Sequence, residues 1–183
     1  MDFSTLSTER LLDMQAAGDD VITCQRVLAK AGLNIVGEVL KGVETFYRMN
    51  HYPEGDVYDH ETHSQYYYHA HRENEHGHFH TFLRPKGMPE GIKPVKVDDF
   101  EEPKQENDAL SHIVAVSMDE YGQAKALFTT NRWVTAEYWY KAEDVIEMLD
   151  YFDIDHASPS WPTNKWIGAF IRLYYPQICE LLH

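Results

Sequence analysis

Cysteines and long hydrophobic runs are scarce in this 183-residue chain. Its two cysteines, Cys24 and Cys179, stand far apart in segments with helical spacing, so neither a disulfide framework nor a paired-cysteine zinc site is expected. No hydrophobic run approaches the length that crosses a membrane, and the first residues lack the basic segment and apolar run of a secretory signal. We therefore expect a cytoplasmic protein with no membrane-spanning segment.

Basic side chains are also few. There are 16 lysines and arginines against 30 acidic residues, which gives a formal net charge of −14 with the histidines neutral. This charge repels phosphate groups, so neither nucleic acid nor an anionic membrane surface is an expected partner. The nucleophile elbow of α/β-hydrolases, the Walker loop and the glycine-rich dinucleotide turn are missing as well. The common nucleotide and hydrolase chemistries therefore lose support.

The hydrophobic pattern predicts an α+β fold in a single domain covering residues 1–183. Residues 1–41 have helical spacing on either side of Gly18-Asp19-Asp20, which predicts two short helices, while Leu33–Lys41 fits a helix or a strand. Residues 64–130 contain two pairs of strand-like segments, which predict an antiparallel sheet of about four strands.

Helices are expected again after the sheet. Residues 141–183 show helical spacing, with a break expected near Pro176 because proline interrupts a helix. Residues 85–110 hold four prolines and many acids, so a long loop is expected inside the sheet region. Helices from both ends of the chain should then pack against the sheet.

Histidines are concentrated in one short segment. Seven of the 11 histidines fall between positions 60 and 80, and five of them belong to the segment from His69 to His80. The aromatic runs on either side of Asn74-Glu75 predict a hairpin. If its turn is centred between these two residues, His71 lies opposite His78 and His69 lies opposite His80.

That pairing predicts one surface that carries imidazoles and another that enters the core. Alternate residues of a strand share a face, and so do opposed residues of antiparallel neighbours. The opposite face would carry Tyr66, Tyr68, Ala70, Phe79 and Leu83. A slip of one residue would instead send the two histidine pairs to opposite faces.

Four neutral imidazoles on one face suit a divalent transition metal. Opposed Cβ atoms lie roughly 5 Å apart, close enough for rings to converge on one ion. We expect His69, His71, His78 and His80 to bind zinc, copper, iron or nickel. Imidazoles packed this closely also depress one another's protonation, which keeps them available as ligands near neutral pH.

Two kinds of metal site fit this prediction. A catalytic site would leave one coordination position open for a small-molecule substrate, with Glu73 or Glu75 as a carboxylate base, whereas a closed shell would serve metal handling. A separate hypothesis is a non-catalytic domain whose acidic surface engages a protein partner while the histidines sense pH. The oligomeric state does not follow from the sequence.

The spacing His69-x-His71 followed by Glu75 resembles the first metal motif of the cupins. In that family, two histidines and a glutamate bind a catalytic metal. The motif has a glycine where this sequence has His63, and another where it has Phe82. No second cupin motif follows.

The run His76-Gly-His78-Phe-His80-Thr-Phe82 resembles the alternating motif of the histidine-triad nucleotide hydrolases and transferases. The resemblance implies that His78 attacks a phosphate, which makes it a third catalytic candidate beside Glu73 and Glu75. Gly77 and Thr81 stand where that family prefers hydrophobic residues.

Most of the chain resembles an uncharacterised bacterial family. The resemblance rests on His69-Ala-His71-Arg72, Gly77-His78-Phe79-His80, the run from Leu127 to Trp133, and Ser160-Trp161-Pro162. It implies a self-contained domain and brings no activity with it.

A second candidate site follows the last predicted strand. Thr129, Thr130, Asn131, Arg132 and Trp133 offer several hydrogen-bonding groups, one guanidinium and one indole. These groups suit the rim of a small-molecule pocket, with Arg132 and Trp133 as cofactor-binding or ligand-binding residues. The alternative is a turn capped by Asn131, with Arg132 paired to a surface acid.

Overall fold

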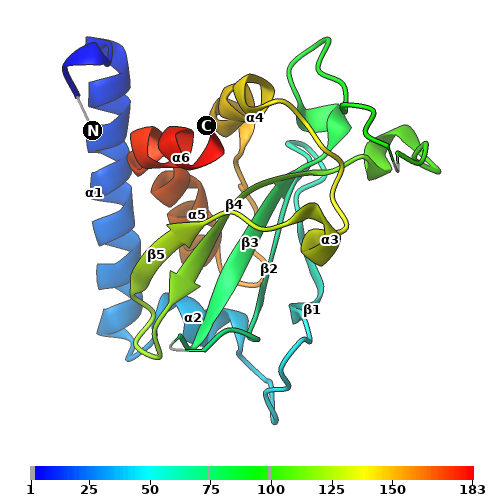
Figure 1. The fold of residues 1–183 in the computed structure, drawn as a ribbon. Helices are drawn as coiled ribbons and strands as arrows, with labels where there is room; N and C mark the ends of the chain where they lie inside the picture. Colours follow the sequence, from blue (N-terminus) through cyan, green and yellow to red (C-terminus); the bar gives the residue numbers. More distant parts are fainter. Residues whose placement is uncertain (1–2, 74, 99) are drawn as a thin grey trace.

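The computed structural model describes residues 3–73, 75–98 and 100–183 and has the predicted α+β fold (Figure 1). Its strands form one antiparallel sheet in which each strand pairs with the next along the chain. The strands are β1 (Tyr52–Tyr58), β2 (Ser64–His69), β3 (Gly77–Leu83), β4 (Ser111–Met118) and β5 (Ala124–Phe128).

Helices come before and after the sheet, as expected. They are α1 (Thr8–Lys30), α2 (Ile35–Val39), α3 (Arg132–Thr135), α4 (Ala142–Met148), α5 (Trp161–Leu173) and α6 (Tyr175–Leu182). Among the described residues, no helix is both long and apolar enough to cross a membrane.

The prediction of two short N-terminal helices is wrong, because α1 runs without a break through Gly18. The buried residues of α1 recur every three or four positions from Met14 to Leu28 and form one stripe that packs along α5. Gly18 belongs to this contact, since an added Cβ would lie 3.5 Å from Leu173. The packing offsets the roughly 1 kcal/mol that a glycine costs inside a helix.

The sheet has one strand more than expected. β1 escapes sequence analysis because Pro53 and Gly55 break the alternating pattern, and both Gly55 and Asp56 have positive φ angles. Its pairing with β2 shifts register between Tyr52 and Val57. Such irregularity is tolerated because β1 is an edge strand.

One face of the sheet is covered by the long helices. The Tyr66 hydroxyl donates to Asn164 Oδ1 of α5 at 2.7 Å, and the ring of Phe79 lies 6.3 Å from that of Trp166. Four of the five residues predicted for this face, Tyr66, Tyr68, Phe79 and Leu83, belong to the main core, and Ala70 is buried too. α3 lies on the opposite side of the sheet from α5 (Figure 1).

Prolines mark two further features of the chain. α5 ends at Leu173 and α6 begins at Tyr175, so the helix breaks beside Pro176, which occupies the first turn of α6. The segment 85–110 contains only two short 3-10 turns among its described residues, Pro85–Gly87 and Glu106–Asp108.

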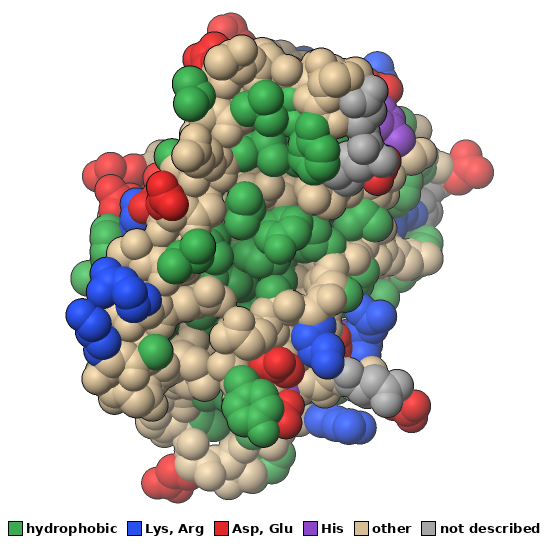
Figure 2. Space-filling model, turned by 90° about the vertical axis from the view of Figure 1, so that its left-hand side faces the viewer, with side chains coloured by type: hydrophobic (Ala, Val, Ile, Leu, Met, Phe, Trp, Pro, Cys, Tyr) green, Lys and Arg blue, Asp and Glu red, His purple; other side chains and the backbone are tan. Residues whose placement is uncertain are grey.

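Some hydrophobic side chains of α1 are exposed. Figure 2 views the side of the molecule on which α1 lies, and hydrophobic side chains gather near the middle of that face. Leu12 and Ile22 of α1 are 60% and 64% exposed. The buried stripe of α1 therefore accounts for only part of its hydrophobic residues.

Candidate metal centre

The hairpin of β2 and β3 places its histidines on the face away from α5. His69 pairs with His78, and Tyr67 pairs with His80. The predicted partners, His71 with His78 and His69 with His80, are therefore wrong by two residues. Because side chains alternate with a period of two, this shift leaves the histidines on a common face.

The register differs because the connection between β2 and β3 is longer than a two-residue turn. β2 ends at His69 and β3 begins at Gly77, so His71 belongs to the connecting loop. The carbonyl of Ala70 accepts from Met49 N, which precedes β1. Asn74, one of the two residues at which the turn was predicted, lies outside the described residues.

Gly77 fixes the point at which β3 meets β2. A Cβ at this position would lie 2.6 Å from the Tyr68 ring and 2.7 Å from the carbonyl oxygen of His69. No side chain fits there without displacing Tyr68 or the backbone of β2. Glycine is therefore required for His78, the next residue, to stand beside His69.

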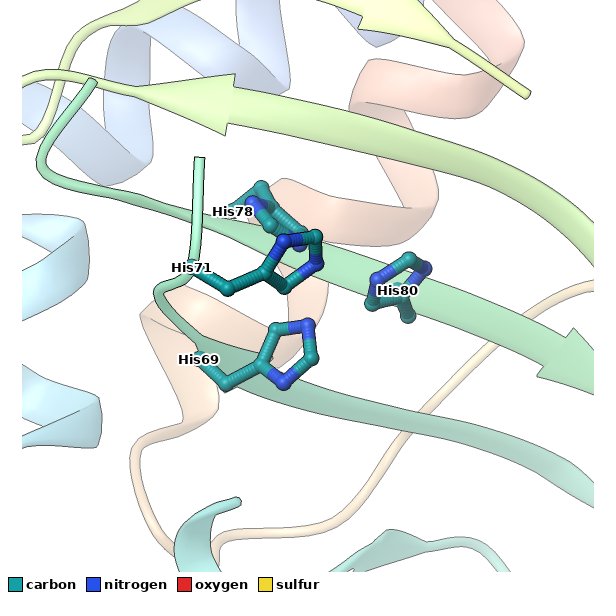
Figure 3. A group of neighbouring side chains, drawn as sticks. All are labelled: His69, His71, His78 and His80. Atoms are coloured by element: carbon teal, nitrogen blue, oxygen red, sulfur yellow. The ribbon is translucent and has the colours of Figure 1, made fainter. Parts of the chain in front are cut away.

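Four imidazoles converge on this face (Figure 3). The ring centroid of His69 lies 4.9 Å from that of His71, 4.6 Å from that of His78 and 5.0 Å from that of His80. One nitrogen of each ring can be chosen so that all four lie within 4.8 Å of one another. The structure thus brings the four predicted ligands together.

The converging nitrogens are buried and have no hydrogen-bond partner among the described residues. This holds for Nε2 of His71, His78 and His80, and for both ring nitrogens of His69. His78 and His80 are fully buried, His69 is 4% exposed, and His71 is partly exposed. An unsatisfied buried polar group costs about 1–3 kcal/mol, so these rings would gain free energy by binding an ion.

Glu75 holds the ring of His78 from the other side. Its carboxylate makes a short hydrogen bond with His78 Nδ1, and its side chain is 3% exposed. The carboxylate favours a proton on Nδ1, which leaves the lone pair of Nε2 free for an ion. A histidine that binds metal through one nitrogen usually donates from the other in this way.

His112 plays the same part for His80. His112 Nε2 lies 3.0 Å from His80 Nδ1, and the backbone N–H of His112 donates to Glu137 Oε2 at 2.8 Å. His112 lies on β4 and is 5% exposed, and it contacts the histidine group from the neighbouring strand.

Burial disfavours the protonated form of the three buried imidazoles. Burial and, to a smaller extent, the neighbouring imidazoles lower the pKa of His69 to about 3. Burial also lowers the pKa of His80 and that of His78, although Glu75 opposes the shift at His78. Neutral imidazole is the form that binds a metal ion.

Besides His112, a further imidazole, which the sequence did not reveal, contacts this group. The ring of His51 stacks on Tyr67 at 3.6 Å and meets His69 edge-on at 5.6 Å. His51 immediately precedes β1, the strand that the pattern did not reveal. Without that strand, nothing in the sequence placed His51 beside the hairpin.

The remaining candidates lie around the group. Glu73 is exposed on the same loop as Glu75, and His76 turns toward the hydroxyl of Tyr68, which belongs to the core face. Arg132 and Trp133 begin α3, where the guanidinium stacks 4.1 Å from the indole. Both line a hollow of about 420 Å³ that also contains Glu137, the residue that holds His112.

Comparison with known proteins identifies a family without an assigned activity. The model of a domain of unknown function (DUF6969) matches residues 15–183, which confirms the predicted resemblance to an uncharacterised family. No curated protein and no solved structure matches the chain. The similarities to cupins and to histidine-triad proteins are therefore not supported by any relative.

Proposed function

The chain belongs to the DUF6969 family, and we propose that it binds one divalent transition-metal ion. The proposed ligands are His69, His71, His78 and His80. One observation carries the proposal: four imidazole nitrogens lie within 4.8 Å of one another on a buried face and lack partners among the described residues.

The spacing of these nitrogens fits an ion after small adjustments. Nitrogens at the zinc distance of about 2.0–2.1 Å stand roughly 3.4 Å apart in a tetrahedron and roughly 4 Å apart across a square. The observed limit of 4.8 Å is slightly wider. His71 supplies the freedom to close it, because it lies in the loop and is partly exposed.

An all-imidazole set favours particular metals. Imidazole suits zinc, copper, iron and nickel, whereas magnesium and calcium prefer oxygen ligands. The absence of thiolates from the set argues against an iron–sulfur cluster. We therefore propose zinc, copper, iron or nickel as the ion.

The chain's own residues prepare the ligands for this role. Glu75 and His112 engage the Nδ1 atoms of His78 and His80, which leaves the unpartnered Nε2 atoms available to an ion. This arrangement makes Glu75 a positioning residue in our proposal, whereas sequence analysis had offered it as a carboxylate base. Glu73 remains a candidate base only if its loop moves, since its side chain faces solvent.

A metal-dependent enzyme is the second candidate. The hollow lined by Arg132 and Trp133 contains Glu137, and Glu137 contacts His112, the partner of His80. A small anionic substrate in this hollow would be held by the guanidinium. If such a ligand binds there, Arg132→Ala should weaken its binding without reducing metal content.

The structure gives little support to the remaining alternatives. A histidine-triad mechanism requires His78 to reach a phosphate, but His78 is fully buried and bonded to Glu75. A solvent-accessible pH sensor would need exposed imidazoles, whereas three of the four are buried. The cupin site belongs to a two-sheet jelly roll, which differs from this five-stranded sheet.

Elemental analysis of protein purified without an affinity tag tests the proposal. We expect near-stoichiometric metal in the native chain and its loss in the double variant His71→Ala, His78→Ala. The matched control is His60→Ala, His183→Ala, which removes two exposed histidines. A native chain that stays metal-free after incubation with each of the four ions would refute the proposal.

A further inference from the structure

A polar hollow of about 690 Å³ lies on the outer side of His51. It is formed by a short stretch of chain that includes the beginning of β1. Its lining offers an imidazole, two carboxylates, an amide and a thioether, from His51, Glu54, Asp56, Asn50 and Met49. All five are groups that can bind cations.

His51 separates this hollow from the buried histidines. One side of its ring lies flat against Tyr67, and the ring contacts His69 at a centroid distance of 5.6 Å. The His51 side chain is nevertheless 42% exposed. It is thus accessible from solvent and in contact with a proposed ligand at the same time.

The ring of His51 is held in a defined orientation. Its Nδ1 bonds to Asp56 Oδ1 at 2.9 Å, and the other carboxylate oxygen of Asp56 accepts from Gln65 at 2.7 Å. Gln65 in turn accepts from Arg84 Nε at 2.8 Å. With Nδ1 engaged by the carboxylate, Nε2 is the nitrogen available to a ligand.

His69 lies directly behind His51 and is incompletely satisfied. It is 4% exposed, and neither of its ring nitrogens has a partner among the described residues. Figure 3 shows one nitrogen of His69 turned toward His71 and the other turned away from the remaining three rings. An ion bound to the buried group thus leaves the second nitrogen of His69 still unpaired.

We propose that this hollow is the entrance through which the metal ion reaches the buried site, and that His51 and Asp56 form a transfer site on the way. The inference rests on the proposed function and adds the route of the ion. His51 itself is outside the set of nitrogens that lie within 4.8 Å of one another, so it takes no part in the final coordination.

The composition of the hollow supports a cation as its occupant. Glu54 and Asp56 place carboxylates at its rim, and such charges raise the local concentration of cations and their rate of association. Three of the four final ligands, His69, His78 and His80, are buried and present almost no surface to an ion in solvent. The half-exposed imidazole of His51 lies beside them and can bind the ion while the ion loses its water ligands.

Stopped-flow measurement of Zn²⁺ uptake and of Zn²⁺ release to a chelating dye tests the route. In His51→Ala, both rates should fall about tenfold, while the equilibrium affinity stays within a factor of about two, because a transfer site changes rates and not the end state. Asp56→Asn should slow both rates less. The control is His60→Ala, an exposed histidine beyond the other end of β1, which should leave them unchanged.

The outcomes separate the two proposals. Zinc binding to the native chain with equal rates in native protein and in His51→Ala overturns the entrance and leaves the site intact. If His51→Ala binds zinc more weakly but does not slow uptake and release together, the entrance is also overturned, and His51 is then a ligand of the final site. If the native chain does not bind zinc, copper, iron or nickel at all, both proposals fail. Should His51→Ala misfold, Glu54→Gln, which changes only the rim, must slow uptake.

Discussion

His80 Nδ1 and His112 Nε2 lie 3.0 Å apart, on two neighbouring strands of the sheet. One of the two nitrogens must donate and the other accept. If His80 binds metal through Nε2, its proton lies on Nδ1, and His112 is the acceptor. The contact between these residues therefore couples the tautomer of a β4 residue to the ligand state of a β3 residue.

Replacing His112 should weaken metal binding without removing a ligand. Outer partners of metal-binding histidines are worth about 10–100-fold in affinity, and we expect His112→Ala to lose that much in competition with a chelator. His112→Gln should recover part of the loss, because the amide oxygen can accept from His80. Equal affinity in native protein and in His112→Ala would show that His112 does not position His80.

Glu75 and Glu73 provide a matched pair on one loop. Glu75→Ala should reduce metal affinity about 10–100-fold, because His78 loses the carboxylate that orients it. Glu73→Ala should change affinity by less than about twofold, since Glu73 faces solvent. Isothermal titration of the two variants with Zn²⁺ makes the comparison. The reverse order of effects would contradict the assigned roles.

Removing a ligand should stabilise the metal-free protein. Both nitrogens of His69 are buried without partners among the described residues, and replacing such a group with an apolar one relieves about 1–3 kcal/mol. We expect His69→Leu to raise the free energy of unfolding by roughly that amount in the presence of a chelator, and to abolish metal binding. Urea unfolding measures the first effect.

The control for this prediction is Phe82→Ala, a truncation of another buried residue of β3. It should lower the free energy of unfolding by about 3–5 kcal/mol. The prediction is contradicted if His69→Leu also lowers the free energy of unfolding of the metal-free chain. The contacts of the His69 ring would then stabilise the apoprotein by more than its unpaired nitrogens cost.

Acid should destabilise the metal-free protein between pH 6.5 and 3. The ordinary pKa of histidine is 6.5, and burial lowers that of His69 to about 3. In this pH range, His69 is protonated in the unfolded chain but not in the folded protein. The free energy of unfolding therefore falls as the pH falls. The limiting slope is about 1.4 kcal/mol per pH unit for each such histidine.

Glu137 changes the pH dependence of stability in the opposite direction to His69. Burial raises its pKa from 4.5 to about 7, so between these values the folded protein binds a proton that the unfolded chain does not. Glu137→Gln should therefore steepen the loss of stability between pH 7 and 4.5. Urea unfolding at several pH values, with and without a chelator, gives the free energy of unfolding of native protein and of Glu137→Gln. The two curves should separate between pH 7 and 4.5.

The sequence predicts the site correctly where side chains alternate with a period of two residues. The common face of His69, His78 and His80 follows from the alternation of side chains along strands. An error of two residues in the predicted pairing leaves this common face unchanged, whereas an error of one residue would have sent the histidines to opposite faces. The pairing itself was not predictable, because the connection between His69 and Gly77 is longer than the two-residue turn that the sequence favours.

The residues that sequence analysis missed reach the site from distant segments. His51 precedes an irregular strand, and Glu137 follows α3. Neither belongs to a repeating pattern, so only the folded chain brings them near the hairpin. The unbroken α1 was missed for a related reason, since its contact with α5 outweighs the local preference of Gly18.

All four proposed ligands come from one hairpin and lie between positions 69 and 80. An ion bound to them links only neighbouring points of the chain, so it restricts the unfolded ensemble much less than a link between the two ends would. Closure of such short loops is also among the fastest events in folding. The hairpin that carries the ligands can therefore form early in folding, before α1 and α5 have met.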